Sequence, residues 1–183
     1  MSATQIQILQ VTGADIAGWL PQLATLRINV FREFPYLYDG SENYERKYLQ
    51  TYVESKSSIA VLALDGERVV GVSTGLALVD EDPAFQKPFV DAGYDCSQIF
   101  YCAESVLLRE YRGLGLYKAF FNSRESHART LPNINMITFC AVQRAENHPR
   151  RPNGYMSLDA IWERFGYHKR EELKTTFTWQ DLD

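Results

Sequence analysis

Residues 99–117 change character twice, and this change constrains the fold more than any other feature of the chain. Residues 99–108 (IFYCAESVLL) are mostly apolar and aromatic, with the length and composition of a strand. Residues 110–117 (EYRGLGLY), called the glycine turn below, contain two glycines. Beyond them, large side chains recur with the spacing of one helix face, at Leu116, Phe120, Arg124, His127 and Leu131. We therefore predict a strand, a turn and a helix.

The glycine turn is suited to bind a diphosphate. A helix start presents unpaired backbone N–H groups and the positive end of the helix dipole, and glycines let a phosphate come close. Arg112 would add a charged fork for the phosphate oxygens. Two other phosphate-binding patterns do not fit. The third glycine of a dinucleotide fingerprint would be Lys118, and the Gly-Lys-Ser/Thr of a P-loop is absent.

The N-terminal part of the chain predicts a strand followed by two helices. Thr12 and Asp15 have the spacing of a capping box, which would start a long apolar helix that runs to Phe34. Ser41 is expected to cap the second helix. This helix carries three tyrosines on one face, Tyr44, Tyr48 and Tyr52.

The remaining segments predict four further strands and a last helix besides the strand, turn and helix described above. Asp65-Gly66 is a strong hairpin signal between two strand-like runs. Ser157 is expected to cap the last helix, which Gly166 would end. The predicted strands cover residues 58–64, 68–78, 135–142 and 175–179.

The order of these elements and two local motifs resemble the GCN5-related N-acetyltransferases (GNAT superfamily) over nearly the whole chain. The acetyl-CoA loop of that family has the pattern Gln/Arg-x-x-Gly-x-Gly/Ala, in which Arg112, Gly115 and Tyr117 occupy the marked positions. Tyr117 departs from the pattern, because a small residue is usual there. Residues 161–167 (IWERFGY) resemble the family's closing leucine-tyrosine-glutamate-lysine-leucine-glycine-phenylalanine.

This resemblance implies an α/β fold with a GNAT-like mixed, mostly antiparallel central sheet flanked by helices on both faces. It also implies that residues 1–183 form a single N-acetyltransferase domain with acetyl-CoA as co-substrate. The pyrophosphate of acetyl-CoA would bind at the glycine turn, and its pantetheine arm alongside the preceding strand. The predicted cofactor-binding residues are Val106, Leu107, Leu108, Arg112, Gly113, Leu114, Gly115, Leu116 and Tyr117.

Composition argues against several other classes of protein. The net charge of −4 is not that of a general nucleic-acid binder. No apolar run approaches the roughly 18 residues of a membrane span, and the N-terminus lacks the pattern of a signal peptide. Cys96, Cys102 and Cys140 are widely spaced and no histidine clusters with them. We therefore expect reduced, mostly buried thiols in a cytoplasmic protein, and no metal.

Glu104 is the predicted general base. A protonated amine must lose a proton before it attacks a thioester, and a carboxylate within reach can accept that proton. Glu104 lies in an otherwise uncharged strand, where a carboxylate is costly to bury unless it is partnered or used. The alternative is a structural glutamate on a solvated or hydrogen-bonded face of the strand.

The family's usual general acid is missing. The resemblance implies a tyrosine on the last helix in this role, but Trp162 stands there, and its indole N–H is no useful acid. Tyr155 is predicted to replace it, and Tyr117 is the alternative. For both tyrosines, a packing role stays open.

Residues 31–40 interleave aromatic and charged side chains before a proline bend. In the family, this helix–helix connection lines the acceptor pocket, which leads us to predict Arg27, Phe31 and Tyr38 as substrate-binding residues. The long connections 80–98 and 144–155 are predicted to contribute substrate walls, with surface decoration as the alternative. Aromatic walls with arginine favour a small acceptor.

The sequence thus predicts an acetyl-CoA-dependent N-acetyltransferase that acts on a primary amine by direct transfer in a ternary complex. Two alternatives stay open: an acyl-CoA-binding module without transfer activity, and a transferase for another acyl group or acceptor. The expected partners are acetyl-CoA and an amine acceptor, without nucleic acid or membrane. Assembly into a homodimer also stays open.

Overall fold

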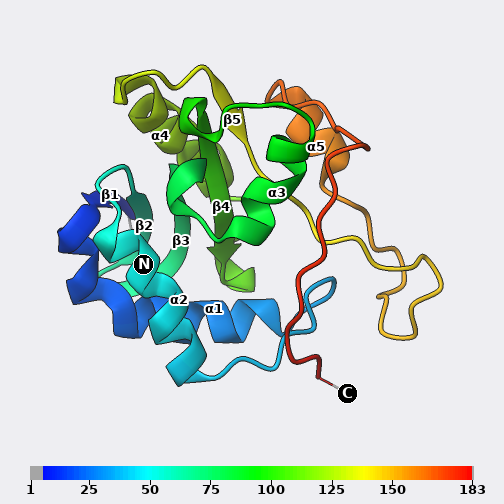
Figure 1. Ribbon diagram of the computed structural model, residues 1–183. Coiled ribbons are helices and arrows are strands. Elements are labelled where there is room, and N and C mark those ends of the chain that lie inside the picture. The colour runs from blue at the N-terminus through cyan, green and yellow to red at the C-terminus, as the bar shows by residue number, and fades with distance from the viewer. Residues whose placement is uncertain (1–5, 183) are drawn as a thin grey trace.

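The computed structural model describes residues 6–182 and has a five-stranded sheet at its centre (Figure 1). The strands are β1 (Gln7–Thr12), β2 (Ile59–Asp65), β3 (Arg68–Ala77), β4 (Ile99–Leu107) and β5 (Met136–Thr138). The α-helices are α1 (Leu20–Phe31), α2 (Glu42–Glu54), α3 (Pro83–Asp91), α4 (Leu116–Thr130) and α5 (Asp159–Arg164). Short 3₁₀ turns lie at η1 (Gly13–Trp19), η2 (Leu78–Asp80), η3 (Cys96–Gln98) and η4 (Arg109–Tyr111).

The sheet is mixed and mostly antiparallel, which confirms the predicted fold class. Its order is β1-β2-β3-β4-β5, and the first four strands pair antiparallel. The predicted hairpin joins β2 and β3, with Asp65 opposite Arg68 and a positive φ at Gly66. This is the conformation for which glycine is favoured in tight turns. Among the strands of residues 6–182, only β5 runs parallel to its neighbour, β4.

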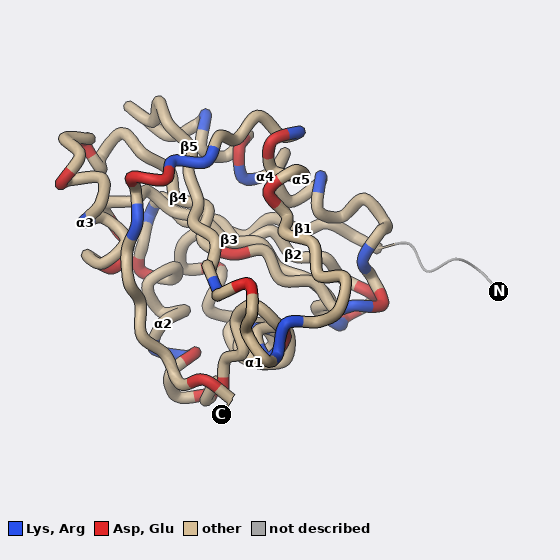
Figure 2. Tube along the Cα trace, turned by 90° about the vertical axis from the view of Figure 1, so that its right-hand side faces the viewer, with Lys and Arg blue, Asp and Glu red and all other residues tan. Residues whose placement is uncertain are grey.

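Helices cover both faces of the sheet and bury a core on each. One core forms between the sheet and α1 and α2, around residues such as Leu23, Leu49 and Leu76. The other forms under α4, around Phe120 and Phe100. Figure 2 shows that charged residues lie mostly on helices and connections, whereas the strands carry few. Nearly uncharged strands buried on two faces are what this layered architecture requires.

The start of the first helix differs from the prediction. Thr12 makes no side-chain capping bond, and residues 13–19 form η1 before the α-helix begins at Leu20. Pro21 follows at the first turn of α1, where it costs no hydrogen bond. The cap of α2 is as predicted, because the Ser41 hydroxyl accepts the N–H of Tyr44.

The structure differs from the prediction in three segments after β3. The connection 80–98, for which no helix was predicted, contains the helix α3, and Pro83 stands at its start. The strand predicted at 135–142 is paired over Met136–Thr138 alone. Residues 175–179 form no strand. They pack against α3 instead, where Phe177 stacks on Phe85 at 5.0 Å and the Thr175 hydroxyl donates to the Ala84 carbonyl.

The C-terminal segment folds back on the connection between α1 and α2. Arg144 links the two, because it donates to both carboxylate oxygens of Asp181 at 2.7 and 2.9 Å and to the carbonyls of Pro35 and Tyr36. The connection predicted to line an acceptor pocket is thereby held against the 144–155 loop. Within residues 6–182, no helix is long and apolar enough to cross a membrane.

Candidate active site

The glycine turn is open to solvent and leads directly into α4. Gly113 and Gly115 both have φ near +80°, a left-handed conformation that L side chains rarely adopt. Gly115 is the N-cap of α4 and has no side chain to accept its first N–H groups. The space beside both glycines is empty, because a Cβ at either position would meet no heavy atom within 4 Å beyond the adjoining residues. The turn therefore offers free amides and room for a phosphate.

Arg112 lies in this exposed turn and is already paired. Its Nε donates to the Leu107 carbonyl at 3.2 Å, and its Nη1 lies 3.0 Å from the Glu33 carboxylate. Arg109 approaches the same carboxylate at 3.5 Å. The Arg112 guanidinium is therefore already paired with the Glu33 carboxylate, and a bound phosphate would compete with Glu33 for the guanidinium.

β4 has one edge without a strand partner beyond Tyr101. β5 pairs with β4 only at Ile99, Phe100 and Tyr101, whereas β4 continues to Leu107 beside β3. In the part of the chain that the structure describes, no further strand adds to that edge. Such an edge can bind an extended amide chain by strand-like hydrogen bonds. The edge runs past the predicted residues Val106 and Leu107 toward the glycine turn.

A β-bulge in β4 determines where Glu104 points. Opposite Thr74 of β3, β4 has two residues instead of one, between Cys102 and Ser105. Before the bulge, Tyr101 faces the α1/α2 core and Cys102 faces α4. After it the alternation is inverted, and Glu104 turns to the α1/α2 side, where Arg27 lies. The extra residue thus brings the carboxylate to the helix face that carries its cation.

Side chains of α4 and β3 hold the backbone of the bulge in place. Arg124 of α4 donates from Nη1 to the carbonyls of Thr74 and Glu104, at 3.4 and 3.2 Å. The Ser73 hydroxyl also donates to the Glu104 carbonyl, at 3.1 Å. Arg124 and Ser73 are both buried, so backbone groups that the bulge removes from the ladder keep hydrogen-bond donors.

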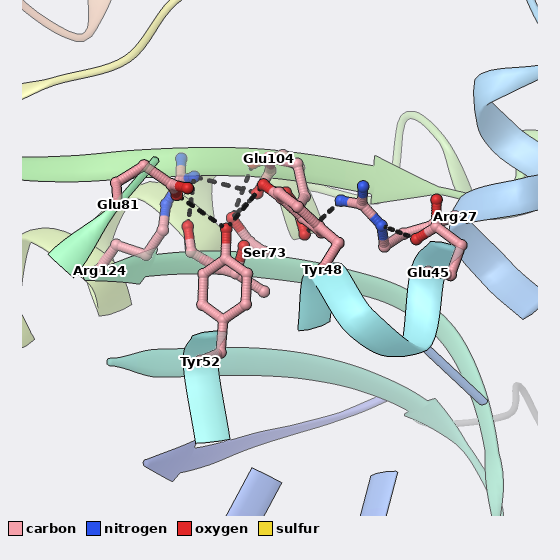
Figure 3. A network of polar contacts seen from close by, with 10 residues as sticks. Arg27, Glu45, Tyr48, Tyr52, Ser73, Glu81, Glu104 and Arg124 are labelled. Atoms are coloured by element: carbon pink, nitrogen blue, oxygen red, sulfur yellow. Dashed lines mark hydrogen bonds and ion pairs between the residues drawn. The ribbon is translucent and has the colours of Figure 1, made fainter. Parts of the chain in front are cut away.

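Glu104 belongs to a buried polar cluster, shown in Figure 3 and called the Glu104 cluster below. Arg27 of α1 is 6% exposed and pairs with two carboxylates, Glu45 of α2 through Nε and Glu104 through Nη1 at 2.7 Å. Burial alone would lower the pKa of Arg27, but the negative charges of Glu104 and Glu45 hold it well above its usual range. The cluster comprises Arg27, Glu45, Tyr48, Tyr52, Glu81 and Glu104.

Two tyrosines of α2 extend the cluster. The Tyr48 hydroxyl donates to Glu104 Oε2 at 3.4 Å and lies 3.0 Å from the Tyr52 hydroxyl. Tyr52 in turn donates to Glu81 Oε2 at 3.5 Å. Burial raises the pKa of both tyrosines well above the usual value, so both stay neutral donors. Glu104 Oε1 lies 2.7 Å from Arg27 Nη1, so the two oxygens of Glu104 face Arg27 and Tyr48 respectively.

The predicted acceptor residues lie at different distances from this cluster. Arg27 is a member, and Phe31 lies under its guanidinium, 4.9 Å from ring centroid to Cζ. Phe31 also contacts Tyr36 of the connection, with ring centroids 4.2 Å apart. Tyr38 is 8% exposed and packs edge-on against Tyr44 of α2. The structure thus brings Arg27 and Phe31 to Glu104, whereas Tyr38 contacts the second helix.

The two predicted acids lie in different surroundings. Tyr155 ends the 144–155 loop, where its ring meets Phe34 edge-on at 4.7 Å and Arg151 lies over it. Tyr117 stands in the first turn of α4, and its hydroxyl accepts the indole N–H of Trp162 at 2.7 Å. Since the indole only donates, the Tyr117 proton stays free for another acceptor. Both tyrosines remain predictions as acids.

Four cluster members were not predicted as functional residues: Glu45, Tyr48, Tyr52 and Glu81. One signal was present in the sequence, because Glu45, Tyr48 and Tyr52 follow at helical spacing and therefore share a face of α2. Glu81 gave no such signal, because it stood among the acidic residues of the 80–98 connection, which was predicted as a substrate wall or as surface decoration. It is 4% exposed in the structure.

The cysteines match the expectation in part. Cys96 and Cys102 are buried, and burial raises the pKa of the Cys102 thiol. Cys140 is exposed, and its sulfur lies 2.9 Å from the Tyr101 hydroxyl. Among residues 6–182, no group of three or more His, Cys, Asp or Glu side chains is placed to hold a metal ion.

Several solved structures with this fold are described as acetyltransferases. The chain is similar to a protein described as a possible acetyltransferase from Clostridium difficile 630, with a TM-score of 0.63 and 10% identity over 97% of this chain and 99% of that one. Aminoglycoside N-acetyltransferase AAC(6')-Iy in complex with CoA gives 0.59 and 12%, over 97% and 96%. A GNAT-family acetyltransferase from Streptococcus pneumoniae TIGR4 gives 0.53 and 13%, over 98% and 100%.

These likenesses show that the chain has the fold of the GNAT acetyltransferases, as the resemblance implied. No protein-family model matches the sequence, and no curated protein matches it. The fold is thus established by the arrangement of elements, while the activity must be argued from the site.

Proposed function

We propose that this protein transfers the acetyl group of acetyl-CoA to a primary amine of a small molecule, by direct attack within a ternary complex. One observation carries the proposal. The unpaired edge of β4 runs from the bulge that holds Glu104 to the open glycine turn at the start of α4. The edge thus has a turn suited to bind the diphosphate of CoA at one end and a carboxylate suited to accept the proton of the amine at the other.

The residues present fit acetyl-CoA. The free amides and empty space at Gly113 and Gly115 suit a diphosphate, with Arg112 beside them. The free edge of β4 near Leu107 would hold an extended arm by backbone hydrogen bonds. Acetyl-CoA, when bound, supplies the activated acyl group. The chain's own contribution is to orient that group, accept a proton from the amine and supply one to the departing thiolate.

Glu104 accepts the proton of the amine in this mechanism, directly or through one water. Amides on the free edge of β4 donate to the oxyanion that forms on the acyl carbon. The Tyr117 hydroxyl, held by Trp162, is our preferred proton donor to the thiolate, with Tyr155 as the alternative. No cysteine takes part, because desolvation raises the pKa of all three thiols and so disfavours the nucleophilic thiolate.

A second candidate is an acyl-CoA-binding protein without transfer activity. The presence of Trp162 where a tyrosine acid would be expected favours it. Isothermal titration with acetyl-CoA, followed by a thiol-release assay over a set of amines, separates the two. Binding without release by any amine would favour the binding protein.

Replacing Gly115 by valine should weaken acetyl-CoA binding at least tenfold, about 1.4 kcal/mol. The new side chain would fill the space through which a phosphate approaches the α4 amides, and φ of +78° disfavours any β-branched residue. Titration calorimetry measures the affinity, and circular dichroism verifies the fold.

Gly66→Val is the matched control. Gly66 also has a positive φ, of +61°, and open space around it, but it lies in the β2–β3 hairpin. The Gly66→Val protein should therefore have similar backbone strain but an unchanged affinity for acetyl-CoA. An unchanged affinity in a folded Gly115→Val protein would place the diphosphate elsewhere.

A further inference from the structure

Glu81 is a buried carboxylate that the mechanism above does not use. It follows η2 at the end of β3 and is 4% exposed. The N–H of Asp82 donates to its Oε1 at 3.0 Å. Within the described chain it forms no ion pair with a Lys, Arg or His side chain, unlike Glu45 and Glu104. Burial, with smaller contributions from the charges of Glu104 and Asp82, raises the pKa of Glu81 to about 7.

A line of hydroxyl groups connects Glu81 to Glu104. Tyr48 and Tyr52 stand one turn apart on α2, so both hydroxyls face the sheet from the same side (Figure 3). The successive oxygen–oxygen distances from Glu104 through Tyr48 and Tyr52 to Glu81 are 3.4, 3.0 and 3.5 Å. Tyr52 is fully buried. The two carboxylates thus lie at opposite ends of one hydrogen-bonded line.

We propose that Glu81 is the final acceptor of the amine proton, which reaches it from Glu104 through the hydroxyls of Tyr48 and Tyr52. This inference rests on the proposed function. Glu104 takes the proton from the amine nitrogen. The Tyr48 hydroxyl, which donates to Glu104 before the transfer, then turns its own proton toward Tyr52 and accepts the proton of Glu104. Tyr52 receives the proton of Tyr48 and passes its own to Glu81. Each hydroxyl accepts one proton and donates one, so that no phenolate forms and only Glu81 changes its charge.

The partners of the two carboxylates explain why the proton should move on. A proton that stayed on Glu104 would remove one of the two charges that balance Arg27, whose guanidinium is buried. Leaving a buried charge without its partner is costly. Glu81 has no cation to lose. Protonation of Glu81 therefore keeps the Arg27–Glu104 ion pair intact and removes a carboxylate charge that burial disfavours.

The titration of Glu81 is set by groups from several elements. α2 presents Tyr44, Tyr48 and Tyr52 to it, and β4 presents Tyr101 and Glu104. Cys140, after β5, and Asp82, next in the chain, complete the set. Apart from Glu81 itself, Glu104 and Asp82 are the carboxylates among them, and both raise its pKa.

The test is the pH dependence of kcat at saturating acetyl-CoA and amine. Glu81 can accept a proton only when it is ionised, so wild-type kcat should fall as the pH drops through about 7. Glu81→Gln should abolish this decline and lower kcat above pH 7 roughly tenfold, less than the loss of the base itself. Tyr52→Phe should have the same effect, because it interrupts the line while keeping the ring.

Tyr44→Phe is the matched control. Tyr44 lies on the same helix and stacks on Tyr48, but its hydroxyl is not part of the line, so the wild-type pH profile should persist. A purely structural role of Glu81 would lower stability without changing the profile. If Glu81→Gln fails to fold, the pH dependence of kcat in Tyr52→Phe decides between the two roles. A wild-type pH profile of kcat in a folded Glu81→Gln or Tyr52→Phe protein would overturn the relay. Turnover of the wild-type protein would still support the proposed function in that case.

Discussion

Replacing Arg27 by methionine should lower the free energy of unfolding by about 3–5 kcal/mol, the usual cost of breaking a buried ion pair from one side. Arg27 is 6% exposed and is the cation between Glu45 and Glu104. Methionine has a similar length but no charge, so two buried carboxylates would lose their partner at once. Chemical denaturation at neutral pH measures the difference.

Arg32→Met provides the control at the end of the same helix. Arg32 also pairs with a carboxylate, Asp39 at 2.9 Å, but both side chains are about half exposed. Exposed pairs contribute about 0–1 kcal/mol, because solvent screens them. A loss in Arg27→Met as small as in Arg32→Met would contradict the view that the Glu104 cluster holds α1, α2 and β4 together.

Glu104→Gln should lower turnover by roughly 10²-fold or more, the scale expected for losing a general base. Glutamine keeps the shape of the side chain but cannot take a proton from the amine. Affinity for acetyl-CoA should hardly change, because the carboxylate addresses the acceptor. Steady-state kinetics and calorimetry on the same preparation separate the two effects.

Glu45→Gln is the matched variant for this comparison. Glu45 is the other carboxylate on Arg27 and is fully buried, so its loss should destabilise the protein in a similar way. It lies outside the line from Glu104 to Glu81, and turnover should fall much less. Near wild-type turnover in Glu104→Gln, or an acetyl-cysteine trapped during the reaction, would overturn the proposed mechanism.

Local signals in the sequence were sufficient for the elements that carry the cofactor proposal. The glycine turn and the Asp65-Gly66 hairpin were both predicted, because positive φ angles leave a direct trace in the residue types. The cap of α2 at Ser41 was predicted for a similar reason. These features depend on a few neighbouring residues, so one sequence suffices to find them.

The Glu104 cluster could not be assembled from the sequence. Its contacts join residues 18, 29 and 56 positions apart, and such separations leave no local pattern. The face to which Glu104 points depends on a single extra residue in β4, which strand alternation does not show. Residues 175–179 have the composition of a strand, but they pack on α3 instead.

The most direct measurement is release of CoA thiol when the wild-type protein is incubated with acetyl-CoA and a set of small primary amines. The proposed function predicts amine-dependent release for at least one of them, with the acetyl group recovered on the amine nitrogen by mass spectrometry. That release should fall about 10²-fold in Glu104→Gln. Binding of acetyl-CoA without release by any amine would contradict an acetyltransferase and leave a binding protein with the same fold.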